Sequence, residues 1–168
     1  MNDLKYLQDE TSKLINLYNA KLFDEVIRKG RILIKKFPNQ ILFYNATALS
    51  LSSKGENDEA IKILNQALNL QPKNINVLNN LGLVNGNINN LKEARSYYMR
   101  ALSINENFVD ALVNLSQLDL NENKIKETKE NLDKALKLSR TPGQEEIINT
   151  SLGFYYQQIG NFKEAIKC

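Results

Sequence analysis

Residues 58–72 read DEAIKILNQALNLQP: an acidic start, apolar residues at helical spacing and a closing proline. Ala60, Leu64 and Ala67 fall on one face of a helix. Pro72 ends that helix because the residue before a proline is pushed out of the helical conformation. The stretch therefore predicts an amphipathic helix whose short side chains allow a second helix to approach closely.

The same pattern returns along the whole chain. The tetrad at 58–61 has counterparts at 24–27, 92–95 and 126–129, each 34 residues apart, and a last one at 163–166 after a step of 37. In this register the units are 7–40, 41–74, 75–108, 109–145 and a partial unit 146–168. A period of this size indicates a helical hairpin that must stack on its neighbours to bury its apolar face.

Each unit is predicted to hold two helices. In the second unit Tyr44, Ala48 and Leu51 share a face of the first helix. Gly55 suits the left-handed turn before the second helix, and Asn89 and Asn123 occupy the same place in the next two units. The stretch 140–143 is expected to carry the extra residues that make the fourth unit longer.

This pattern resembles the tetratricopeptide repeat family over essentially the whole chain, most closely in residues 58–72 and in the pair Leu81 and Gly82. The resemblance implies an all-α fold, a right-handed superhelical solenoid of antiparallel helix hairpins. About four and a half units would form a single domain, 1–168. The first unit departs from the pattern, since Leu14 stands at a small-residue position and Gly30 at a bulky one. We expect the two changes to compensate in size.

The last unit stops at Cys168, partway through its second helix. Solenoids usually end in a helix with a polar outer face. We therefore expect this chain to be the N-terminal part of a longer protein, or its open edge to be covered by another chain, with homo-oligomerisation as one form of that cover.

In the family the first helices of the hairpins line a concave groove, which implies the binding surface here. The pair Asn80 and Asn114 resembles the asparagine ladder of protein O-linked N-acetylglucosamine transferases, although Ser12, Ala46 and Ser151 break it. Basic side chains that would clamp a carboxylate are missing from the corresponding positions. The residues predicted to bind a peptide are Asn45, Leu49, Asn76, Asn79, Asn80, Leu83, Asp110, Asn114 and Gln117.

The amino-acid composition argues against catalysis, metal binding and nucleic-acid binding. The chain has no histidine and one cysteine, so no catalytic or metal-binding set is expected, and no cofactor. A net charge of +3 over 168 residues makes nucleic acid an improbable partner. The basic residues of the second helices, Lys62, Arg95, Lys129 and Lys134, are expected on a solvated convex face. With no apolar span and no signal peptide, we expect a cytoplasmic location and no membrane partner.

The predicted function is a protein-protein interaction scaffold, not an enzyme, that binds an extended peptide or a partner helix in its groove. Three alternatives stay open at this point. The chain could be the substrate-presenting arm of a larger transferase. It could self-assemble through its open C-terminal edge. It could bind RNA as other helical hairpin repeats do, although that function requires a basic groove.

Overall fold

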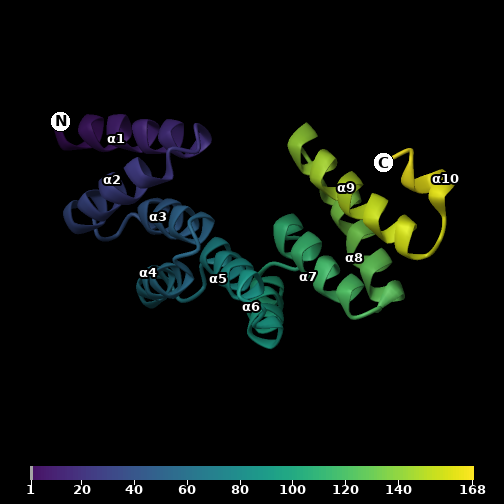
Figure 1. Cartoon of the computed structure of the whole chain (residues 1–168). Coiled ribbons are helices and arrows are strands. Elements are labelled where there is room, and N and C mark those ends of the chain that lie inside the picture. Colours follow the sequence, from purple (N-terminus) through teal and green to yellow (C-terminus); the bar gives the residue numbers. More distant parts are fainter. Residues whose placement is uncertain (1) are drawn as a thin grey trace. The chain divides into compact units, whose positions relative to one another are not determined.

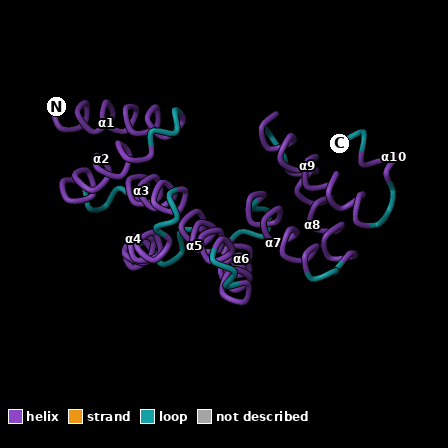
Figure 2. The backbone as a smooth tube through the Cα atoms, in the orientation of Figure 1, coloured by secondary structure: helices purple, strands orange, loops and turns teal. Residues whose placement is uncertain are grey.

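The computed structural model describes residues 2–168, with side chains from Leu4 onward, and these residues form helices and no strand (Figures 1 and 2). The all-α prediction is confirmed. The helices are α1 (Asn2–Asn19), α2 (Phe23–Lys36), α3 (Ile41–Ser53), α4 (Asn57–Leu70), α5 (Ile75–Asn87), α6 (Leu91–Ile104), α7 (Val109–Asn121), α8 (Ile125–Leu138), α9 (Pro142–Gln158) and α10 (Phe162–Ala165).

Packing divides the chain into two compact units. The first unit, which ends at Asn90, holds α1–α5, and the second, Leu91–Cys168, holds α6–α10. The boundary falls inside the third predicted repeat, between its two helices. Each unit has a core of its own. One buried cluster of the first unit is built on Leu14, Val26, Leu33 and Phe43. The second unit has a larger cluster that α7, α8 and α9 contribute.

Within the first unit, successive helices pack side by side, and the first helices of the hairpins also contact one another. Helix α3 packs against α1, α2, α4 and α5. Its predicted inner face is confirmed, because Ala48 and Leu51 are fully buried. Ala60 and Ala67 of α4 are fully buried as well. Small side chains at these positions let the helices lie close together, as the sequence pattern indicates.

The turn inside each hairpin uses a left-handed residue. Gly55, Asn89 and Asn123 have φ values of 84°, 62° and 59°, which confirms the three turn predictions. Lys21 and Gly160, at the corresponding places of the first and fifth hairpins, also have positive φ. All five hairpins therefore turn in the same way, with a non-glycine residue at three of these places.

The extra length of the fourth unit lies in a helix, because Pro142 and Gly143 of the stretch 140–143 begin α9. Helix α9 has 17 residues, whereas α3, α5 and α7 have 13 each. The Thr141 hydroxyl accepts a hydrogen bond from the Gln144 backbone N–H at 3.2 Å and so caps the helix. Pro142 follows in the first turn, where its missing N–H costs nothing.

The space beside Gly30 is filled from the next repeat. A Cβ atom added to Gly30 would lie 1.9 Å from Thr47 Oγ1, and the next two nearest atoms also belong to Thr47. Thr47 is fully buried on α3, and its hydroxyl donates a hydrogen bond to the Phe43 carbonyl at 2.7 Å. Gly30 therefore allows a close fit between α2 and α3, and its expected compensation in size by Leu14 stays a prediction.

Arg95 does not lie on a purely solvated face, which corrects the sequence prediction for this residue. Its Nη1 atom is 2.7 Å from Oδ1 of Asp119, a carboxylate only 3% exposed on α7. Asn131 of α8 donates to the other Asp119 oxygen at 3.3 Å. Asp119 thus joins α6, α7 and α8, because a buried carboxylate needs partners for its charge.

Glu10 makes a similar link in the first unit, between α1 and α2. It is 7% exposed and pairs with Lys29 of α2 and, at 2.9 Å, with Lys13 of its own helix. The hydrogen bond from Lys29, followed by that from Lys13, lowers the pKa of the Glu10 carboxyl below its ordinary value of 4.5. The ionised form is therefore the one that the fold stabilises.

This shift predicts a pH-dependent effect of Glu10→Gln. A carboxyl whose pKa is lower in the folded state contributes stability above its unfolded pKa and loses it as pH falls through the folded pKa. We expect Glu10→Gln to lower the free energy of unfolding at about pH 7 and to lower it less near pH 3, which is below the ordinary pKa. Urea unfolding at both values measures this. The exposed Asp9→Asn change on the same helix is the control, and an equal pH trend in the two variants would contradict the prediction.

Candidate functional site

A pocket of about 340 Å³ lies in the first unit along the helices predicted to line the groove. Its lining comes mainly from α1 and α3, with two residues at the start of α5. Of the predicted binding residues, Asn45, Leu49 and Asn76 belong to it. The complete lining is Ile15, Tyr18, Ile41, Leu42, Asn45, Ala46, Leu49, Asn74 and Asn76.

The pocket is uncharged. Its lining contains no aspartate, glutamate, lysine or arginine. Ile15 and Leu42 remain 41% and 39% exposed, so apolar surface is open to a ligand. Tyr18 contributes its ring, and burial raises the pKa of its hydroxyl, which stays neutral and able to donate a hydrogen bond. Such a surface suits apolar side chains and offers no cation to a carboxylate.

Two amides of the pocket differ in their hydrogen bonding. Asn74 uses both ends of its side chain: its oxygen accepts from the Val77 backbone N–H at 3.1 Å, and its nitrogen donates to Gln71 at 2.8 Å. The oxygen of Asn45 is buried and has no hydrogen-bond partner among the described residues. A buried acceptor left unpaired costs roughly 1–3 kcal/mol. Asn45 therefore presents an unused acceptor beside an apolar surface.

The other predicted residues of the first unit lie outside the pocket lining. Asn79 is buried at 7% exposure, so it presents little surface to a ligand, contrary to the expectation of an accessible groove residue. Asn80 is half-buried, and Leu83 is 36% exposed. All three belong to α5.

The remaining predicted residues lie on α7 of the second unit. Asn114 and Gln117 are half-buried, and the Gln117 amide donates to Asn121 at 3.4 Å. Asp110 is exposed at the start of the helix, yet desolvation by nearby protein atoms raises the pKa of its carboxyl. The amide row from Asn80 to Asn114 joins residues of different units and stays a prediction.

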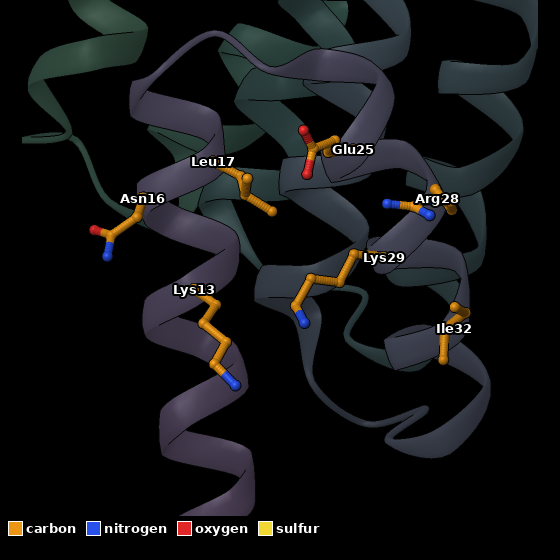
Figure 3. Close-up of a pocket in the computed structure, with 7 residues that line it drawn as sticks. All are labelled: Lys13, Asn16, Leu17, Glu25, Arg28, Lys29 and Ile32. Atoms are coloured by element: carbon orange, nitrogen blue, oxygen red, sulfur yellow. The ribbon is translucent and has the colours of Figure 1, made fainter.

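Sequence reasoning missed a second pocket, of about 600 Å³, between α1 and α2 (Figure 3). Helix α1 contributes Lys13, Asn16 and Leu17 to it, and α2 contributes the rest of the lining. The residues from α2 are Glu25, Arg28, Lys29 and Ile32. A signal was present in the sequence, because Lys13 stands where the later repeats have Thr47, Leu81, Leu115 and Leu152.

Other kinds of site were sought among the described residues. No group of three or more histidine, cysteine, aspartate or glutamate side chains there could hold a metal ion. None of the helices that the structure describes is long and apolar enough to cross a lipid bilayer.

Comparison with known families matches the middle of the chain. A family model described as TPR repeat matches residues 48–89, and one described as tetratricopeptide repeat matches residues 75–108. The peroxisomal targeting signal receptor of Saccharomyces cerevisiae is 30% identical over 100 residues. That match covers 58% of this chain and 16% of the receptor, so the chain spans less than a fifth of the relative.

Solved structures share the fold over nearly the full length. A thermophilic TPR protein of Thermus thermophilus has a TM-score of 0.83 at 16% identity, covering 95% of this chain and 86% of its own. PilF of Pseudomonas aeruginosa has a TM-score of 0.78 at 17% identity, covering 99% and 75%. MamA has a TM-score of 0.66 at 22% identity, covering 90% and 87%. At these identities the likeness shows the helical solenoid fold.

Proposed function

We propose that this chain, whose middle matches tetratricopeptide repeat models, is an interaction scaffold. Its groove along α1, α3 and α5 binds an extended, uncharged segment of a partner protein. The main support is the pocket in this groove. It combines exposed apolar surface with an unpaired amide oxygen and has no charged lining residue. The alternatives of a transferase arm and of self-assembly stay predictions.

The size of the pocket suits one or two side chains and a stretch of backbone. Its volume of about 340 Å³ lies at the lower end of the range for ligand pockets, about 300–1,000 Å³. Ile15, Leu42 and Leu49 supply contacts for an aliphatic or aromatic side chain. Burial of such a side chain contributes about 1.5–3 kcal/mol. The apolar contacts therefore supply affinity for residues that are themselves apolar.

Asn45 would fix the orientation of the bound peptide backbone. If the Asn45 side chain turned toward the pocket, its buried oxygen would accept a backbone N–H of the ligand, which would remove the cost of leaving that oxygen unpaired. An amide can hold a peptide backbone whatever the neighbouring side chains are. Selectivity would then come from the apolar contacts and from the lack of a cation, which disfavours an acidic tail.

The proposal predicts how peptides selected on this chain respond to two substitutions. Peptides are selected from a random library on the wild-type chain, and their affinities are measured by fluorescence anisotropy. We expect Leu42→Asp to weaken binding by about tenfold or more, because it puts a charge into the apolar surface. Asn45→Ala is expected to weaken it about three- to tenfold.

Two matched changes on α4 serve as controls. Leu70 is 44% exposed, close to the 39% of Leu42, and Asn65 is half-buried as Asn45 is. Leu70→Asp and Asn65→Ala should leave peptide affinity within about twofold, since neither residue lines the pocket. Peptides that bind all four variants equally well would refute the groove as their site.

A further inference from the structure

The pocket between α1 and α2 has a counterpart in the next hairpin, where a helix fills it. Lys13 and Glu25 lie 34 residues before Thr47 of α3 and Glu59 of α4. Thr47 packs against Gly30 of α2, and Arg31 of α2 pairs with Glu59 at 2.7 Å. Helix α2 thus contacts both sides of the second hairpin at the places that correspond to Lys13 and Glu25.

This correspondence indicates that a helix could cover the pocket between α1 and α2. On α3, Thr47, Ser50 and Leu51 are fully buried. The corresponding residues of α1 are Lys13 and Asn16, which are exposed, and Leu17, which is half-buried. The same face of the same kind of hairpin is therefore covered by a helix in one repeat and open in the other. The open face therefore corresponds in register to the face that α2 covers on the second hairpin.

The charges of the pocket define its chemistry. Lys13, Arg28 and Lys29 line it, and Figure 3 shows them on the facing sides of the two helices. Glu10 pairs with both lysines, and Glu25 is the only carboxylate in the lining. Three positive charges against two negative ones leave a net charge of +1. Arg28 forms no ion pair with any residue that the structure describes.

Apolar surface lies among these charges. Leu17 is half-buried near the middle of the pocket, and Ile32 of α2 is 61% exposed. A ligand with only negative charge would leave both unused. An amphipathic helix can place apolar side chains on Leu17 and Ile32 while its flanking positions meet the cations.

We propose that an acidic amphipathic helix of a partner protein docks between α1 and α2, in the position that α2 itself occupies on α3 and α4. Its apolar side chains contact Leu17 and Ile32, and its carboxylates face Arg28 and Lys13. This site is separate from the groove of α1, α3 and α5, so the two proposals can fail independently.

The test uses a synthetic helix as the probe. It is an acetylated, amidated, fluorescein-labelled peptide of about 18 residues, long enough to be partly helical alone. Leucines at i, i+3 and i+7 form one face, and glutamates flank them. A twin peptide has lysine at every glutamate position. Fluorescence anisotropy with the full chain is expected to show about tenfold tighter binding of the glutamate peptide, weakening with added salt.

A pair of charge reversals on α2 locates the site. Arg28→Glu should weaken binding of the glutamate peptide by about tenfold. Lys35 is also exposed but lies outside the pocket lining, so Lys35→Glu should change the affinity less than about twofold. Circular dichroism checks that both variants are folded.

Four results would each overturn the proposal. The two peptides could bind wild type equally, or the glutamate peptide could fail to bind. Both charge reversals could weaken binding to the same extent. Sedimentation could show a dimer that Arg28→Glu dissociates, which would identify a second copy of this chain as the occupant.

Discussion

Gly30→Ala is expected to lower the free energy of unfolding of the first unit by about 1–2 kcal/mol. Extra volume in a packed helix interface costs about 1–3 kcal/mol, whereas alanine in place of glycine inside a helix contributes about 0.5–1 kcal/mol. The new Cβ would lie 1.9 Å from the Thr47 hydroxyl, and Thr47 is fully buried, so its side chain has no free space to enter. The steric cost therefore exceeds the gain in helix propensity.

A double-mutant cycle with Thr47→Ala isolates this contact. The single change Thr47→Ala removes the hydrogen bond to the Phe43 carbonyl and leaves a small cavity, so it also destabilises the unit. In the double variant the alanine at 30 enters the vacated space. We expect the double variant to be more stable than the sum of the single changes predicts, by about 1–2 kcal/mol.

Gly86→Ala is the matched control for this experiment. Gly86 also lies in a helix, α5, and nothing lies within 4 Å of the position its Cβ would take. That change should be neutral or stabilising, by up to about 1 kcal/mol. Urea unfolding followed by circular dichroism compares the variants. Equal stability of Gly30→Ala and Gly86→Ala would show that α2 and α3 can separate to accommodate the methyl group.

Much of the fold could be predicted because the same local sequence signal occurs several times along the chain. A left-handed residue ends the first helix of every hairpin, and three of the five were identified by residue type alone, as Gly55, Asn89 and Asn123. Lys21 has no such preference. Its conformation follows from its place in the repeat, since the same turn must join the same two helices.

The neighbours of a residue were harder to predict than its helix face. The repeat register shows that Gly30 departs from the pattern but not which side chain fills the space. The expected compensation by Leu14 stays a prediction, whereas Thr47 of the next hairpin, which the sequence did not single out, supplies the contact that the structure shows. Periodicity describes one element at a time, and packing depends on two elements together.

The residues of the candidate groove also show that periodicity does not predict the surroundings of a side chain. Asn45 and Asn79 occupy equivalent places in successive repeats, and both were predicted to bind a ligand. The structure gives Asn45 a pocket and an unpaired oxygen, whereas Asn79 is 7% exposed. Residue type and register are the same in the two cases. The difference comes from the surroundings of each helix, which the sequence of one chain does not reveal.

Asp119 is the clearest case of a residue that periodicity overlooks, and its loss should have the largest effect on the second unit. We expect Asp119→Ala to lower the free energy of unfolding by about 3 kcal/mol, because removing one partner of a buried ion pair leaves the other without compensation. Arg95 keeps Glu122 at 3.1 Å, which places the cost at the lower end of the usual range of about 3–5 kcal/mol. Asn131 also loses its acceptor, which no other residue replaces in the hydrogen bonds of the described residues.

The matched comparison is Asp133→Ala. Asp133 pairs with Lys129 one turn away on α8, and its side chain is 44% exposed, against 4% for Asp119. The same chemical change should therefore cost only about 0.3–0.5 kcal/mol there. Hydrogen exchange measured in each unit assigns the loss to the second, since repeat arrays can unfold in parts. If the two variants were equally stable, the link that Asp119 makes between α6, α7 and α8 would add no more than a surface pair.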